Sequence, residues 1–116
     1  MTYSELKKLL DIHRKLARSQ SAVFGYIDNE PVGDVEKLLQ LRSEYENLHA
    51  WFNNFLNSVE DLYIKSLLYK RYQKDYSWVK ISLSEGGMAS DDCYRKTVDR
   101  YLQKVAPGLA PYGKQA

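Results

Sequence analysis

The sequence predicts an all-α protein, with an antiparallel helical hairpin over residues 1–58 and three shorter helices over residues 59–105. Three observations support this fold class. Apolar residues recur at the spacing of an α-helix. Capping residues stand before each periodic segment, and clusters of Gly, Pro, Asn and Asp separate the segments. Residues 106–116, with two Pro and two Gly, predict a flexible tail.

Composition narrows the class of protein. The chain has 116 residues, 44% of them hydrophobic and 28% charged, as expected for a globular protein of one domain. No apolar run is long enough to span a membrane, and the first residues lack the apolar core of a signal peptide. Cys93 is the single cysteine and cannot form an intrachain disulfide. These features predict a cytoplasmic protein that does not interact with membranes.

The first helix is expected to begin at Thr2, because Thr2 and Glu5 have the spacing of a capping box. Its expected end is near Phe24. The positions that share its apolar face are Leu6, Leu9, Leu10, His13, Leu16 and Ala17.

A turn is predicted over Gly25–Gly33, which contains Asp28-Asn29 and Pro31, and Asp34 is a suitable N-cap for the second helix. The seam of this helix alternates near three and four residues, through Val35, Leu38, Arg42, Tyr45, Leu48 or His49, Phe52, Phe55 and Val59. The hairpin formed by these two helices is also a candidate dimer interface.

Ser58, three residues before Asp61, predicts the start of a third helix. Its candidate buried positions are Leu62, Ile64, Leu67, Leu68 and Tyr72. A turn at Lys74-Asp75-Tyr76 leads to Ser77, the expected N-cap of a fourth helix, whose inward side chains are Trp78, Ile81 and Leu83. Gly86-Gly87 ends this helix, since glycine readily adopts the left-handed backbone of a helix C-terminus.

Ser90 is the expected N-cap of the fifth helix, which ends before Pro107. Its first turn carries Asp91 and Asp92, where negative charge suits the helix dipole. Its apolar stripe consists of Tyr94, Val98, Tyr101, Leu102 and Val105.

The charges divide unevenly along the chain. Residues 1–64 hold 7 Lys/Arg and 10 Asp/Glu, whereas residues 65–104 hold 9 Lys/Arg and 5 Asp/Glu. An acidic half and a basic half suggest protein contacts for the first and a polyanionic partner for the second.

Three short helices, the last one basic outside its apolar stripe, have the layout of a helix-turn-helix that binds double-stranded DNA. In such motifs the second helix of the pair reaches base edges and phosphates with polar and cationic side chains. The candidate contacts on the fifth helix are Ser90, Arg95, Lys96 and Arg100. The candidates for neighbouring phosphates are Lys70, Arg71, Lys74 and Lys80.

The run from Leu67 to Tyr72, the segment Tyr76–Ser82 and the basic helix with Tyr94-Arg95-Lys96 resemble the fourth-region DNA-binding domain of bacterial sigma factors. The layout is also similar to that of small phage regulators of the RinA and ArpU type. The resemblance covers roughly residues 60–105. It implies a transcription regulator that binds duplex DNA and acts with RNA polymerase, located in the host cytoplasm if a phage encodes it.

By the same resemblance, scaffold roles fall to Arg71, Tyr72, Ser77 and Trp78, and groove contacts to Arg95, Lys96 and Arg100. The stretch Ser84–Ala89 is longer than the usual turn. Asp91, Asp92 and Asp99 would be repelled by phosphate.

Other site chemistries have weaker support. His13 and His49, with Glu46, could meet across the hairpin as a metal site, but both lie near apolar stripes where packed histidines are common. Cys93 has no histidine nearby in sequence, so a half-buried structural cysteine is expected rather than a nucleophile. Gly86-Gly87 lacks the strand and the Gly-Lys-Ser/Thr of a phosphate loop. Tyrosines interleaved with Lys and Arg could stack on single-stranded bases.

Two functions remain after this comparison, and neither is enzymatic or requires a cofactor. The first is sequence-specific binding of duplex DNA. The alternative is a small helical interaction module that binds a host or phage protein through its basic half.

Overall fold

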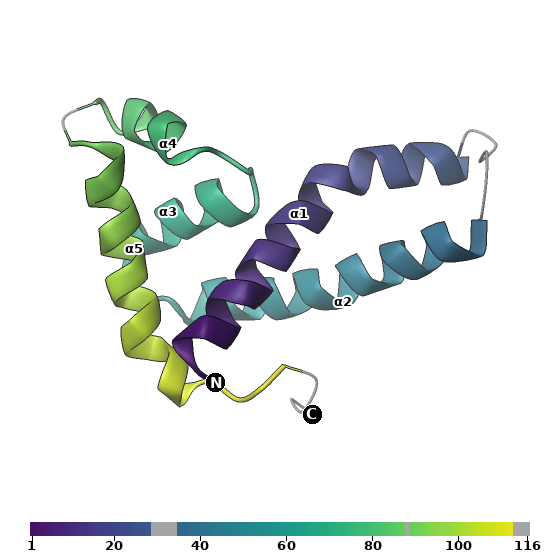
Figure 1. Cartoon of the computed structure of the whole chain (residues 1–116), viewed down its shortest axis with the longest axis horizontal. Coiled ribbons are helices and arrows are strands. Elements are labelled where there is room, and N and C mark those ends of the chain that lie inside the picture. Colours follow the sequence, from purple (N-terminus) through teal and green to yellow (C-terminus); the bar gives the residue numbers. More distant parts are fainter. Residues whose placement is uncertain (29–34, 88, 113–116) are drawn as a thin grey trace.

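The computed structural model describes residues 1–28, 35–87 and 89–112, and every regular element among them is helical. This confirms the all-α prediction for the described residues. The elements, in chain order, are α1 (Tyr3–Asp28), α2 (Val35–Ser58), α3 (Leu62–Tyr72), α4 (Trp78–Ser84), α5 (Asp91–Val105) and the 3-10 turn η1 (Ala106–Gly108). The two long helices α1 and α2 run in opposite directions (Figure 1). The shorter helices α3, α4 and α5 lie on the side of the pair where α1 begins and α2 ends (Figure 1).

Most of the predicted caps are present. The amide of Glu5 donates to Thr2 Oγ1 at 3.1 Å, and the amide of Thr2 donates to Glu5 Oε1 at 3.5 Å. Ser77 and Ser90 cap α4 and α5 by accepting from the amides of Lys80 and Cys93. Each cap satisfies an amide that has no partner within its own helix, so α1, α4 and α5 have defined starts.

Two predicted boundaries are wrong. The helix α1 continues to Asp28, because one glycine at position 25 costs a helix only about 1 kcal/mol and does not end it. Asp61, not Ser58, is the N-cap of α3, and its carboxylate accepts from the amides of Tyr63 and Ile64. Ser58 instead donates to Phe55 O at the end of α2. The remainder of the expected turn, including Pro31 and the proposed cap Asp34, lies outside the described residues.

A single hydrophobic core joins the long helices to the short ones. Side chains with no exposed surface come from α1, α2, α3, α4 and α5: Leu6, Leu10, Phe52, Leu67, Leu68, Ile81, Val98 and Leu102. On α2 the expected positions Tyr45, Leu48, Phe52 and Phe55 are buried, together with Trp51 and Leu56, and the expected position Val59 is buried directly after the helix. The side chains of Val35 and Leu38 lie outside the description.

Two apolar positions predicted to be buried are exposed. Leu62 is 77% exposed and Leu83 is 70% exposed, whereas Ser82 is buried. The core side of the seven-residue helix α4 runs through Trp78, Ile81 and Ser82, which places Leu83 on the other side. Ser82 satisfies its hydroxyl by donating to Ala89 O at 2.6 Å. Trp78 was expected in the core but lies half-buried at its edge.

The chain after α5 does not leave the core at once. Ala106 is fully buried in η1, and Leu109 packs partly buried against the core. The N-terminal amine of Met1 donates to Leu109 O at 2.7 Å, so the start of the chain lies against this segment (Figure 1). The expectation of a loose tail from residue 106 is therefore wrong for its first four residues.

Candidate nucleic-acid interface

The candidate interface lies on α5, with α4 and α3 behind it. The turn between α3 and α4 contains Asp75 in a left-handed conformation, with φ 58°. The turn after α4 uses Gly86 and Gly87 at φ 97° and 70°. The amide of Gly87 donates to Ser82 O at 2.9 Å, which closes the end of α4. Glycine makes this backbone possible without steric cost, so the long turn has a defined geometry at its glycines.

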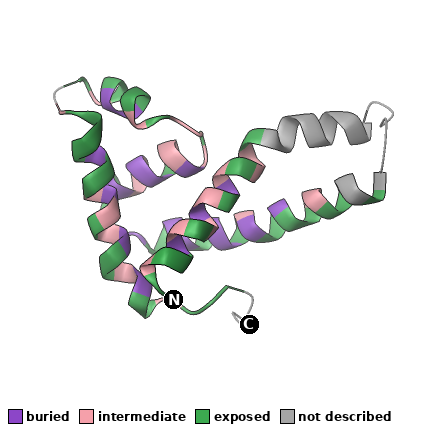
Figure 2. Cartoon of the chain, in the orientation of Figure 1, coloured by how far each residue is buried: buried purple, intermediate pink, exposed green. Residues whose placement is uncertain are grey.

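Opposite sides of α5 have different surroundings. Buried and exposed positions both occur along α5 (Figure 2). Tyr94, Val98 and Leu102 are buried against the core, whereas Lys96 and Arg100 are exposed. Lys96 and Arg100 are one helical turn apart and therefore share a face. Neither makes an ion pair with any side chain in the described part of the chain. Both side chains can therefore bind an external anion without giving up an ion pair within the protein.

The other two predicted contacts on α5 are already engaged. Arg95 Nη2 donates to Asp92 Oδ1 at 2.7 Å, in a pair exposed to solvent. Ser90 Oγ accepts from the amide of Cys93 at 3.3 Å as the helix cap. Arg95 keeps further donors, since a guanidinium carries five N–H groups in a planar fork. The charge of Asp92, which would repel phosphate, is thus partly compensated by Arg95.

Of the predicted phosphate contacts, Lys70 and Arg71 are structural. Lys70 Nζ contacts Glu85 Oε1 at 2.6 Å and so joins α3 to the end of α4. Arg71 donates to Tyr76 O at 3.0 Å and lies 5.0 Å from the centre of the Trp78 ring. Burial and then the charge of Arg14 lower the pKa of Arg71.

Lys74 and Lys80 remain exposed and make no ion pair within the described residues. Their amines lie over the rings of Tyr69 and Tyr76, at 5.7 and 4.2 Å from the ring centres. Such cation–π contacts at exposed sites contribute about 0.5–1 kcal/mol, which leaves both amines free to move to a phosphate.

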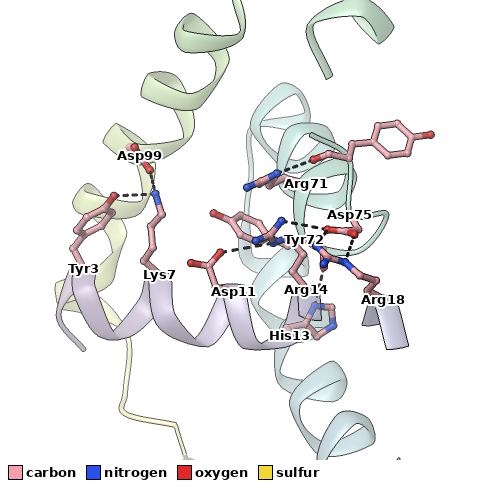
Figure 3. Close-up of polar contacts among 11 residues, drawn as sticks. Tyr3, Lys7, Asp11, His13, Arg14, Arg18, Arg71, Tyr72, Asp75 and Asp99 are labelled. Atoms are coloured by element: carbon pink, nitrogen blue, oxygen red, sulfur yellow. Dashed lines mark hydrogen bonds and ion pairs between the residues drawn. The ribbon is translucent and has the colours of Figure 1, made fainter. Parts of the chain in front are cut away.

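The helices α3, α4 and α5 with their connecting turns are called the α3–α5 unit below. The polar contacts that α1 makes with this unit were not predicted from the sequence (Figure 3). Lys7 Nζ contacts Asp99 Oδ1 on α5 at 2.8 Å. Arg14 and Arg18 contact the carboxylate of Asp75 at 3.3 and 2.6 Å. The spacing of Arg14 and Arg18 shows that they share a helical face, but no signal in the sequence identifies an acidic partner more than fifty positions away.

His13 and His49 meet across α1 and α2, as the sequence suggested, with His13 Nε2 and His49 Nδ1 3.1 Å apart. His13 Nδ1 lies 3.0 Å from Tyr72 O, which can only accept, so this nitrogen carries the proton. His13 Nε2 then accepts from His49, whose Nε2 in turn accepts from Asn53 Nδ2 at 3.3 Å. Hydrogen bonds therefore use all four ring nitrogens. No group of three or more possible ligands is placed to hold a metal in the described residues.

Cys93 is exposed, so the expectation of a half-buried cysteine is wrong. It occupies the solvent side of the first turn of α5, where its sulfur lies 3.4 Å from Ser90 Oγ. This position is next to the candidate DNA-contacting residues and away from the core.

No family model, curated protein or solved structure matches this chain. Along the described parts of the chain, no helix has both the length and the apolar character required to cross a membrane.

Proposed function

We propose that this protein binds double-stranded DNA in a sequence-specific manner, with α5 as the helix that enters the major groove. The observation that carries the proposal is the pair of exposed cations Lys96 and Arg100, which share the side of α5 opposite its buried stripe. An arginine on a groove-facing helix can form two hydrogen bonds with guanine, and a lysine supplies charge. Arg95 adds a third cation beside them.

Further support comes from the order and packing of the short helices. The two serine-capped helices α4 and α5 follow one another and share the core with α3, which supports the proposal of a helix-turn-helix domain. Exposed Lys74 and Lys80 supply charge near the start of α4, where the first helix of such a pair crosses the DNA backbone. The likeness to sigma-factor and phage regulator domains agrees with this assignment and adds RNA polymerase as a partner of the regulator. The site of action would be the cytoplasm.

The test begins with selection from randomised duplex DNA, followed by binding titrations at several salt concentrations. Arg100→Ala should weaken binding to the selected duplex by about 1–3 kcal/mol and relax the preference at one base. Lys80→Ala should weaken all duplexes alike and lower the salt slope by about one. Lys8→Gln, a change of one exposed charge on α1, is the control. If the parent protein binds no duplex even at low salt, the proposal is wrong.

We also propose that residues 1–58 carry the contact of a homodimer, since paired half-sites about one DNA turn apart require two reading helices. Ile12 and Leu39 are exposed apolar residues on these two helices. Sedimentation at high micromolar concentration, with and without DNA, tests this. A monomer under both conditions would reject it.

A protein-interaction module is the second candidate, and exposed apolar residues on α4 favour it. Val79 and Leu83 lie one turn apart and are 57% and 70% exposed. Exposed apolar pairs of this kind are common anchors for a partner helix. Absence of duplex binding by the parent protein, combined with a normal fold, would favour this function over DNA recognition.

A further inference from the structure

The first helix is connected to the proposed DNA-binding helices at three separate places (Figure 3). Lys7 contacts α5 through Asp99, His13 contacts the last residue of α3 through Tyr72 O, and Arg14 and Arg18 contact the turn before α4 through Asp75. These contacts join segments 57 to 92 positions apart in the sequence. The long helix α1 is therefore joined to α5, to the end of α3 and to the turn before α4.

The contact at α5 is specific in its geometry. Lys7 Nζ lies 2.8 Å from Asp99 Oδ1 and 3.5 Å from the hydroxyl of Tyr3, and both members of the ion pair are partly buried. Burial disfavours the charged amine, but the hydrogen bond and charge of Asp99 outweigh that effect and raise the pKa of Lys7. Asp99 lies one turn after Arg95 and directly before Arg100 on α5. Lys7 thus holds α5 in the middle of its cationic segment.

The contacts at the other end of α1 are equally defined. Arg18 Nε and Nη2 lie 2.6 and 3.1 Å from the two carboxylate oxygens of Asp75, a bidentate pair that fixes direction as well as distance. His13 donates to Tyr72 O, a carbonyl at the end of α3 that has no partner within the helix. Positions 7 and 18 are about 16 Å apart along a helix axis. Two anchors this far apart on one helix restrict the movement of α5 relative to the end of α3.

We propose that Lys7 is a positioning residue for DNA reading, and that α1 and the α3–α5 unit form one DNA-binding unit. This inference rests on the proposed function. Base recognition needs the reading helix within about 0.5 Å of its productive position, whereas attraction to the phosphate backbone tolerates many orientations. A residue that sets the tilt of α5 therefore governs selectivity more than overall attraction to DNA. The same contact also neutralises Asp99, the carboxylate closest to Arg100 in sequence.

The test compares the selected duplex with a random duplex, using the full chain. Lys7→Gln removes the ion pair, Lys7→Arg keeps a cation at the position, and Lys7→Gln with Asp99→Asn removes both partners. Lys8→Gln is the matched control, because it is the next residue on the same helix and carries the same charge change. Circular dichroism first establishes that each variant is folded at the temperature of the binding assay.

Lys7→Gln should weaken the selected duplex by about 5- to 100-fold, the loss typical of one spoiled base contact. Its effect on the random duplex should be about twofold at most, because one partly paired surface charge contributes little. Lys7→Arg should bind almost as the parent does. Adding Asp99→Asn to Lys7→Gln should cause no further loss, because both changes remove the same contact. Lys8→Gln should affect the two duplexes equally.

Two results would overturn the inference while leaving the proposed function intact. One is a parent that selects its duplex and a Lys7→Gln variant that behaves like Lys8→Gln. The other is an equal loss on both duplexes, which would make Lys7 a source of charge only. A parent that binds no duplex overturns the proposed function, and the role of Lys7 in reading with it. Hydrogen exchange without DNA would then separate the two failures, since a positioning contact predicts faster exchange in α5 of Lys7→Gln than of Lys8→Gln.

Discussion

Acidification from pH 6.5 to about 4 should destabilise this protein through one histidine, His13. His13 has no exposed surface and is stacked on Phe52, with the ring centres 4.1 Å apart. The pKa of His13 is lowered from 6.5 to about 4, first by burial and also by the charge of His49, and the hydrogen bond to Tyr72 O offsets only part of this. Protonation would also place a second N–H on Nε2, facing the N–H of His49.

The sign follows from the two pKa values. Between pH 6.5 and about 4 the unfolded chain binds a proton at this residue and the folded chain does not, so stability is lost as the pH falls through this window. A difference of 2.5 pKa units corresponds to about 3 kcal/mol, which is a large part of the 5–15 kcal/mol typical of a domain. Arg18 and then Arg14 lower the pKa of Asp75, so the stability that Asp75 contributes is lost only at still lower pH.

Urea unfolding followed by circular dichroism at pH values from 7.5 to 4 measures this loss. His13→Gln is the reference, because an amide can donate to Tyr72 O and accept from His49 without titrating. The free energy of unfolding should fall by about 3 kcal/mol more in the parent than in the variant between pH 7.5 and 4. Parallel curves for the two proteins would refute the assignment of a buried, neutral His13.

Three substitutions test the packing and the caps. Phe52→Ala should cost about 3–5 kcal/mol in the free energy of unfolding, because the side chain is fully buried; a much smaller loss would show that the ring is not in the core. Asp61→Ala should cost about 1 kcal/mol as the loss of an N-cap, and Ser58→Ala clearly less; the reverse order would restore Ser58 as the cap. Trp78→Ala should cost about 1–3 kcal/mol, less than a fully buried tryptophan, and thermal melts of both proteins measure it.

Local signals predicted much of the fold because the relevant interactions are local. The caps at Thr2, Ser77 and Ser90 act within three residues, and the glycines after α4 act through their own backbone. The failures occur where tertiary packing decides. Leu62 and Leu83 have the apolar character of core residues, but the helices that carry them turn other positions inward. In helices as short as α3 and α4, the apolar character of a residue does not by itself show whether its side of the helix is covered.

The candidate interface was predicted less completely than the fold, because sequence shows which residues are charged but not which charges are already paired. Arg95 and Asp92 lie three positions apart, so their ion pair could have been anticipated from helical spacing. Lys70 pairs with Glu85 across a turn, and that pairing required the path of the chain. Within the described residues, Lys96, Arg100 and Lys104 are the cations of α5 that are exposed and make no ion pair.

The contact between Lys7 and Asp99 joins the acidic half of the chain to the basic half. By sequence, Lys7 belongs to a helix on an acidic half with no evident connection to DNA, and Asp99 is a charge that disfavours phosphate. Lys7 Nζ lies 2.8 Å from Asp99 Oδ1. The lysine offsets the negative charge of Asp99, and the aspartate connects α1 to α5. Their pairing joins α1 directly to α5 and so supports the proposal that α1 and the three short helices act as one DNA-binding unit.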